Sequence, residues 1–161
     1  MQERAEALKR LRLLLDGMGS SKVTLIGDVM LDRFHHGYAN NLDSTAPVPV
    51  LKIIRSEETP GAAAHIAMGL NSLGLSVSLH CCVGDDREGK IIIEKLSDDG
   101  IDTSGVGVVP GRNTLTKIRF YGSRESLLDK SQILLQADRG PGEELTEGIS
   151  ASLTASAMSS L

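Results

Sequence analysis

The stretch that decides the fold is residues 22–32, KVTLIGDVMLD. It opens with a β-branched and apolar run at 23–26 that shows no polar alternation. Such a run is typical of a strand buried on both faces, as in a parallel sheet covered by helices. Gly27 ends the run and allows the backbone to turn or to approach a ligand closely. The sequence therefore predicts that the first strand of an α/β sheet lies here.

Two acidic residues, Asp28 and Asp32, follow this strand closely. Ligands of open α/β sheets bind beyond the carboxyl ends of the strands, so both carboxylates stand where a site is expected. The alternative is structural: Asp28 caps a turn and Asp32 is a solvated surface acid. Spacing alone favours the structural interpretation.

The composition is ordinary for a soluble globular protein, and 161 residues suffice for one domain with its own core. The formal net charge of −4, from 21 acidic and 17 basic residues, argues against a nucleic-acid surface built on positive charge. No apolar run approaches the length of a membrane span. The mixed charges of the first 17 residues are unlike a secretory signal.

The only cysteines, Cys81 and Cys82, are adjacent. Neighbouring residues of a strand point to opposite faces, so the pair is poorly placed for a shared metal or for a disulfide. Two reduced thiols fit a cytoplasmic protein better. No carboxylate or histidine cluster recurs at metal-ligand spacing, and no metal site is predicted.

Hydrophobic periodicity predicts alternating helices and strands. Helices are expected at 3–16, 61–74 and 86–98, with a weak one from 143, and strands at 22–26, 75–83, 106–109, 114–121 and 132–137. The last two strands are expected to form a hairpin. Extended pieces at 33–38 and 48–55 flank a turn-rich segment, where Pro47 and Pro49 exclude a helix. The whole is a βαβ pattern with an inserted antiparallel appendage.

The segment GDDREGK, 84–90, has the spacing of a phosphate-binding loop between a strand and a helix. Two features argue against that function. Ile91 stands where a magnesium-binding Ser or Thr is needed, and three acids would lie where phosphates should be. We interpret Asp85 or Asp86 as the N-cap of the following helix.

The segment PGAAAH, 60–65, places small residues at a helix start and leaves backbone N–H groups uncovered. Such a terminus can bind a hydroxyl or an anion, although small residues equally permit close packing on a sheet. Lys117 and Arg119 share one face of a strand and could hold a phosphate, or could simply be solvated. His80, on a strand expected to be buried, is predicted to be a core histidine with satisfied hydrogen bonds.

Taken together, several motifs resemble the PfkB family of ribokinase-type carbohydrate kinases, in the family's order, over about residues 22–138. The subgroup most resembled is the D-glycero-β-D-manno-heptose-7-phosphate kinase domain. The motifs are LIGDVMLDRF (25–34), APVPV (46–50), PGAAAHIA (60–67), VGDDREG (83–89), GIDTSGV (100–106) and TKIR (116–119).

The resemblance implies a ribokinase-like three-layer α/β/α fold with a small β-sheet lid, incomplete at the C-terminus. Residues 1–161 would be the amino-terminal part of one such domain, with lid segments near 33–55 and 114–138. The implied activity is ATP-dependent phosphorylation of a sugar or sugar phosphate hydroxyl, with ATP and Mg²⁺ as cofactors. A homodimer formed through the lid is also implied.

The resemblance also assigns substrate-binding residues. Asp32 and the backbone of Gly61 and Ala62 match positions that bind sugar hydroxyls, and Ala62 stands where the family usually has a second glycine. His65 stands where the family usually has an asparagine that holds the sugar. Lys117 and Arg119 match the TK-x-R pattern of the heptose kinases, where a sugar phosphate could be met.

The family's phosphate-transfer parts are absent from residues 1–161: the G-x-G-D general base, the nucleotide pocket and the N-x-x-E magnesium motif. No catalytic residue is therefore assigned, and the general base is expected beyond residue 161. Because phosphoryl transfer depends on positioning and charge stabilisation, the chain alone is expected to show no turnover. The alternative function is a non-catalytic sugar-binding or dimerising module.

Overall fold

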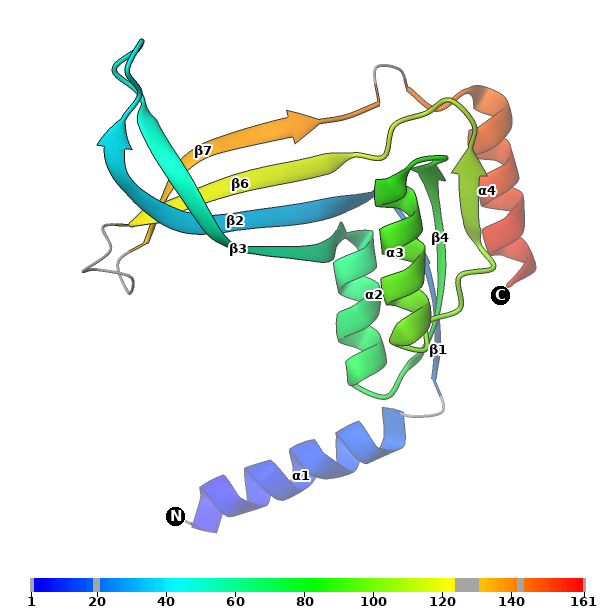
Figure 1. The fold of residues 1–161 in the computed structure, drawn as a ribbon. Coiled ribbons are helices and arrows are strands. Elements are labelled where there is room, and N and C mark those ends of the chain that lie inside the picture. The colour runs from blue at the N-terminus through cyan, green and yellow to red at the C-terminus, as the bar shows by residue number, and fades with distance from the viewer. Residues whose placement is uncertain (1, 19–20, 124–130, 142–143, 161) are drawn as a thin grey trace.

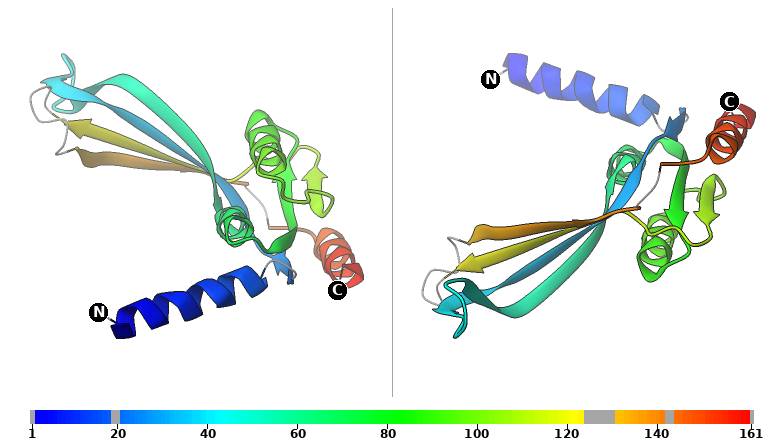
Figure 2. Two further views of the ribbon diagram at one scale, coloured as in Figure 1. Left: turned by 90° about the horizontal axis from the view of Figure 1, so that it is seen from below. Right: turned by 90° about the horizontal axis from the view of Figure 1, so that it is seen from above.

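The computed structural model describes residues 2–18, 21–123, 131–141 and 144–160. The elements are α1 (Gln2–Met18), β1 (Lys22–Ile26), β2 (Val29–Leu42), β3 (Pro49–Ala62), α2 (Ala63–Ser72), β4 (Ser76–Gly84), α3 (Arg87–Asp98), β5 (Val106–Val109), β6 (Thr116–Ser123), β7 (Gln132–Arg139) and α4 (Glu147–Ser159). They form two sheets: the core sheet, ordered β1-β4-β5, and the projecting sheet, ordered β3-β2-β6-β7. Figures 1 and 2 show that the projecting sheet is long and twisted and extends away from the body formed by the core sheet and its helices.

The core sheet is parallel and is covered by helices on both faces. One face of β4 packs against α2 and α3 in a core that includes Leu79, Ala64 and Ile92, all fully buried. On the other face His80, 3% exposed, makes hydrogen bonds with Ser156 and Ser160 around α4. The layer order is therefore helix, sheet, helix, and the prediction of His80 as a satisfied core histidine is confirmed.

β1 is less buried than the sequence predicts. Its residues are half-buried or exposed, and Ile26 is 55% exposed. The reason is its place in the described part of the sheet, where β1 pairs with β4 along one edge and has no partner along the other. The cysteines are both free thiols, and burial raises the pKa of Cys81 to about 12.

The projecting sheet is built on a hairpin much longer than predicted. β2 and β3 each run for 14 residues, and Asp43 N–H donates to the carbonyl of Val48 at 2.9 Å across their turn. Irregular pairing with β3 at His36/Gly37 and at Tyr38/Asn41 allows β2 to continue through the turn-type residues Gly37 and Asn40. Asp32 consequently lies inside a strand, and not in a loop beyond the first strand.

The same sheet joins distant parts of the chain. β2 pairs parallel with β6, and β6 pairs antiparallel with β7, which confirms the predicted hairpin of the last two strands. The loop expected to join that hairpin falls largely on 124–130, and the start of the predicted last helix falls on 143. Both lie outside the described residues.

The helix α1 extends away from the body in both views of Figure 2 and in Figure 1. Its leucines are exposed, Leu8 at 58% and Leu14 at 67%. Within the described residues, none of the helices combines the length and apolar character needed to cross a membrane.

Candidate functional site

Asp32 is the centre of a polar cluster near the base of the projecting sheet. Its Oδ1 accepts a hydrogen bond of 2.7 Å from Nη1 of Arg119, 87 residues away in sequence. Its Oδ2 lies directly over Gly61, so a β-carbon at that position would collide with the carboxylate. The Asp32 side chain is only 18% exposed. The carboxylate is therefore held in one orientation between a guanidinium and a residue that has no side chain.

Arg119 is itself fixed from a second side. Its guanidinium carbon lies 5.3 Å from the ring centroid of Phe34, which shares a strand face with Asp32 two residues earlier. The same face continues with Tyr121 and His36, whose rings stack 5.1 Å apart. This aromatic strip was not predicted from the sequence. If residues 29–42 had been predicted as one strand, the alternation of side chains would have placed Phe34 and His36 on the same face as Asp32.

Lys117 stands beside Asp32 in the parallel register of β2 and β6. Its Nζ lies 3.8 Å from Oδ2 of Asp138 on β7. The two basic residues predicted to meet a phosphate therefore each face a carboxylate, so the four charges cancel. A phosphate would have to compete with those carboxylates. The long Lys117–Asp138 ion pair is easier to replace than the 2.7 Å Arg119–Asp32 bond.

The third part of the cluster is the junction of β3 and α2. Gly61 is buried, whereas Ala62 is exposed and has φ 54° and ψ −127°, a backbone region that L-residues rarely adopt. Ala63 N–H donates to the carbonyl of Asp28 at 3.0 Å, and no side chain caps the helix. His65 is exposed in the first turn of α2, and no described contact joins it to Asp32.

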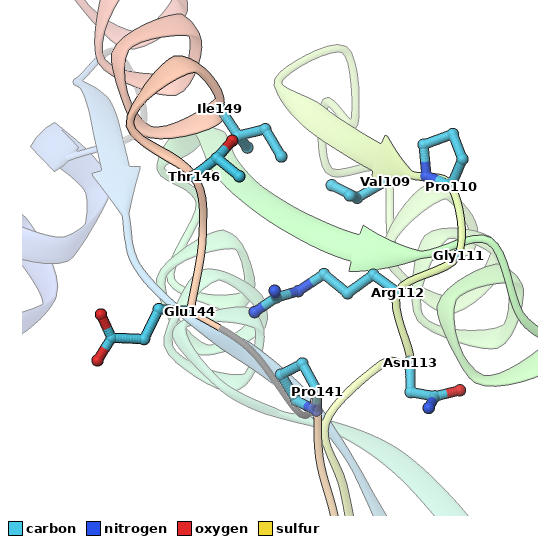
Figure 3. Close-up of a pocket in the computed structure, with 9 residues that line it drawn as sticks. All are labelled: Val109, Pro110, Gly111, Arg112, Asn113, Pro141, Glu144, Thr146 and Ile149. Carbon is cyan, nitrogen blue, oxygen red and sulfur yellow. The ribbon is translucent and has the colours of Figure 1, made fainter.

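Two cavities lie elsewhere, beyond the carboxyl ends of the core strands. The larger, about 410 Å³, is lined by residues of the β5–β6 connection and of the start of α4, including Arg112, Glu144 and Thr146. Figure 3 shows the Arg112 side chain pointing into the space between the end of β5 and the segment that leads into α4. A second cavity, about 270 Å³, includes Asp28 and Cys82. Neither holds Asp32, so the polar cluster is a feature of the open sheet face, and the sequence carried no signal for Arg112.

Solved structures with a similar fold include several that are named as sugar kinases. A putative sugar kinase from Clostridium perfringens matches with a TM-score of 0.61 and 16% identity, over 84% of this chain and 40% of that one. An uncharacterized sugar kinase from Pyrococcus horikoshii, solved in complex with ATP, matches with a TM-score of 0.52 and 23% identity, over 78% and 37% of the two chains. The fold is therefore ribokinase-like α/β, as the sequence predicted.

The sequence comparisons identify the family. The chain belongs to the pfkB family of carbohydrate kinases, whose profile matches residues 20–134. Among curated relatives, the bifunctional protein HldE of Magnetococcus marinus is 36% identical over 123 residues, 76% of this chain and 25% of that protein. HldE of Hyphomonas neptunium is 40% identical over 119 residues, 74% of this chain and 24% of that protein. The chain thus spans about a quarter of the length of these relatives, which agree with the predicted resemblance to the heptose kinases.

Proposed function

We propose that this chain supplies the acceptor-sugar side of a carbohydrate kinase that phosphorylates a hydroxyl of a sugar or sugar phosphate. The observation that carries the proposal is the fixed Asp32 carboxylate, held over Gly61 by Arg119. An ionised carboxylate can accept hydrogen bonds from two neighbouring hydroxyls and can therefore bind a polyol. Family membership supports the same function.

We propose roles for the remaining predicted residues on the same geometry. The backbone at Gly61 and Ala62 lies next to the Asp32 carboxylate and suits contact with a sugar ring, because no long side chain intervenes. His65 offers a ring nitrogen from the exposed first turn of α2. Lys117 is the better candidate for a sugar phosphate, since its ion pair with Asp138 is loose. Arg119 is bound to Asp32 and chiefly orients that carboxylate.

The proposed nucleotide is ATP with Mg²⁺, which the family implies and which one similar structure holds as ATP. Within the described residues, no group of three or more His, Cys, Asp or Glu is placed to hold a metal ion. The basic residues of the site face carboxylates. A triphosphate at these two basic residues would have to displace the carboxylates of Asp138 and Asp32. We assign no residue of this chain to the nucleotide, the metal or the general base, and we propose that residues 1–161 alone do not turn over ATP.

We further propose that the projecting sheet acts as the lid of the domain and as a homodimer contact. Its edge strand β3 exposes large apolar side chains, Val50 at 45% and Ile53 at 47%. An exposed apolar edge strand is a ready surface for pairing with another chain. This observation also supports the second candidate function, a non-catalytic sugar-binding or dimerising module.

The free thiols of Cys81 and Cys82 support a cytoplasmic location.

The function is tested by calorimetric titration of D-glycero-β-D-manno-heptose 7-phosphate into the chain. We expect saturable binding that Asp32→Asn weakens by about tenfold or more, because removing a charged hydrogen-bond acceptor costs roughly 1.5–3 kcal/mol. Gly61→Ala is expected to weaken binding as well, since it pushes the same carboxylate aside.

The matched control is Asp43→Asn, which changes an exposed acid in the β2–β3 turn. This variant should bind like the unchanged chain. Equal affinity of the Asp32 and Asp43 variants, or no binding by the unchanged chain, would contradict the proposed site. ATP hydrolysis or transfer to the heptose phosphate by residues 1–161 would contradict the assignment of the chain to the sugar side alone.

A further inference from the structure

The motif at 84–89 has no part in sugar binding as proposed above, yet it forms the junction between α3 and the projecting sheet. Asp86 is the N-cap of α3, and its Oδ1 accepts from Gly89 N–H at 2.9 Å. The same carboxylate accepts from the N–H of Thr114 at 2.8 Å and from its hydroxyl at 2.6 Å. Gly84 N–H in turn donates to the Thr114 hydroxyl at 2.9 Å. The segment that enters β6 is therefore tied to the start of α3.

Glu88, in the first turn of α3, extends this junction across several strands. It is 6% exposed. Its Oε1 lies 3.1 Å from Nη2 of Arg33 on β2, and its Oε2 lies 3.5 Å from Nη1 of Arg139 at the end of β7. β2 and β7 are not neighbours, because β6 runs between them. A single buried carboxylate thus joins α3 to two separate strands of the projecting sheet.

Arg33 also connects this junction to β3, through an ion pair with Glu58. Its Nε donates to Glu58 at 2.7 Å, and its side chain is 17% exposed. Burial disfavours the charged guanidinium, yet its hydrogen bonds to Glu58 and Glu88 raise the pKa of Arg33 above the ordinary value. Removing one partner of a buried ion pair leaves the other charge uncompensated, so the members of this network depend on one another.

The position of the network relates it to the candidate site. Asp32 and Arg33 are successive residues of β2, so their side chains lie on opposite faces of the sheet. Asp32 faces the polar cluster, and Arg33 faces α3. α3 packs on the core sheet, as does α2, whose first turn carries His65. The angle at which β2 leaves the body therefore sets where Asp32 lies relative to the start of α2.

We infer that Glu88 is a positioning residue, which holds the base of the projecting sheet against α3 and thereby sets the place of Asp32 relative to the first turn of α2. The inference rests on the proposed function in so far as Asp32 binds the ligand. Its mechanical part, the control of the sheet angle by Glu88, can be tested without any ligand.

The ligand-free test measures the distance between two spin labels, one on Asn41→Cys at the exposed end of β2 and one on Asp98→Cys at the end of α3, in a Cys81→Ala/Cys82→Ala background and in an excess of unlabelled chain, so that only distances within one subunit are recorded. We expect one narrow distance distribution for this parent and a clearly broader one after Glu88→Gln. Glu94→Gln, an exposed glutamate of the same helix, should leave the distribution unchanged. If Glu88→Gln does not fold, the same measurement is made on Arg139→Gln. This substitution removes one of the two arginine partners of Glu88, and it should be tolerated because the Arg139 side chain is half-exposed. An unchanged width in the folded variant overturns the inference.

The second test titrates heptose 7-phosphate into the same variants without labels. We expect Glu88→Gln to weaken binding by about threefold to tenfold, although residue 88 lies behind the sheet, whereas Glu94→Gln has no effect. Failure of the unchanged chain to bind would count against the proposed function, and the label distances would still decide the role of Glu88. Normal binding by Glu88→Gln together with an unchanged distance distribution would overturn the inference on both counts.

Discussion

Ala62 adopts a backbone conformation that glycine tolerates and alanine resists, with φ 54° and ψ −127°. Among the described residues it is the one non-glycine with positive φ. At this residue the backbone passes directly from the end of β3 into the first turn of α2, so it must change direction sharply. The hydrogen bond from Ala63 N–H to the Asp28 carbonyl stabilises this corner. Such strained residues cost of order 1–3 kcal/mol and persist when the surroundings determine them.

Ala62→Gly is therefore expected to stabilise the chain. Relief of the strain outweighs the added freedom of glycine in the unfolded state, for a net gain of about 1 kcal/mol. Urea unfolding followed by circular dichroism measures the change. The control is Ala155→Gly at an exposed position inside α4, which should lose about 1 kcal/mol instead. A loss of stability in both variants would show that the corner is not strained.

At the scale of elements, α3 depends on the charge of Asp86. Burial opposes ionisation, but hydrogen bonds from the Thr114 hydroxyl and N–H and from Gly89 N–H lower the pKa of Asp86 below its ordinary value. A carboxyl whose pKa is lowered by folding stabilises the folded state above its unfolded pKa of about 3.9. That stabilisation is lost as the pH falls through the lowered folded value.

Asp86→Asn should accordingly lower the free energy of unfolding by roughly 1–2 kcal/mol at pH 7. The difference between the two proteins should stay constant from about pH 7 to pH 5 and shrink below about pH 4, as the native carboxyl takes up a proton. Denaturant unfolding at several pH values measures it. Asp85→Asn, at the exposed neighbouring acid, provides the control and should change little. A difference that grows on acidification would refute the assignment.

The elements with strong periodicity could be predicted, and those shaped by long-range pairing could not. Residues 63–72 and 87–98 carry helical spacing and end signals, and both form the expected helices. The 29–42 strand could not be predicted, because Gly37 and Asn40 are turn residues that only irregular pairing accommodates. In the site, the approach of Asp32 to Gly61 follows from neighbouring strands of one hairpin. The Arg119–Asp32 bond needs the parallel pairing of β2 with β6, which no local pattern reports.

At the scale of the whole molecule, the projecting sheet exposes apolar side chains along both outer strands. β3 exposes Ile53 and Ile54, and β7 exposes Ile133 and Leu135. If two copies pair through this sheet, as proposed, a charge on β3 should separate them. Ile53→Lys is expected to raise the dimer dissociation constant by about tenfold or more. Sedimentation velocity over a concentration series measures it.

Ile66→Lys is the matched control, because Ile66 is equally exposed, at 53%, but lies on α2. This variant should sediment as the unchanged chain does. A monomer at every concentration for the unchanged chain, or equal dissociation of both variants, would exclude the projecting sheet as the contact.

The pairing of β2 with β3 has two irregularities, one with the extra residue on β3 and one with it on β2, and they divide the hairpin into parts with different tolerance of added length. From Val29 to His36 the pairing with β3 is regular, and a residue inserted before Asp32 would exchange the faces of Asp32 and Arg33. Beyond Gly37 the ladder already accommodates extra residues. Relatives whose projecting sheets differ in length should therefore gain and lose residues toward the tip of this hairpin, whereas the spacing from Gly27 to Asp32 stays constant.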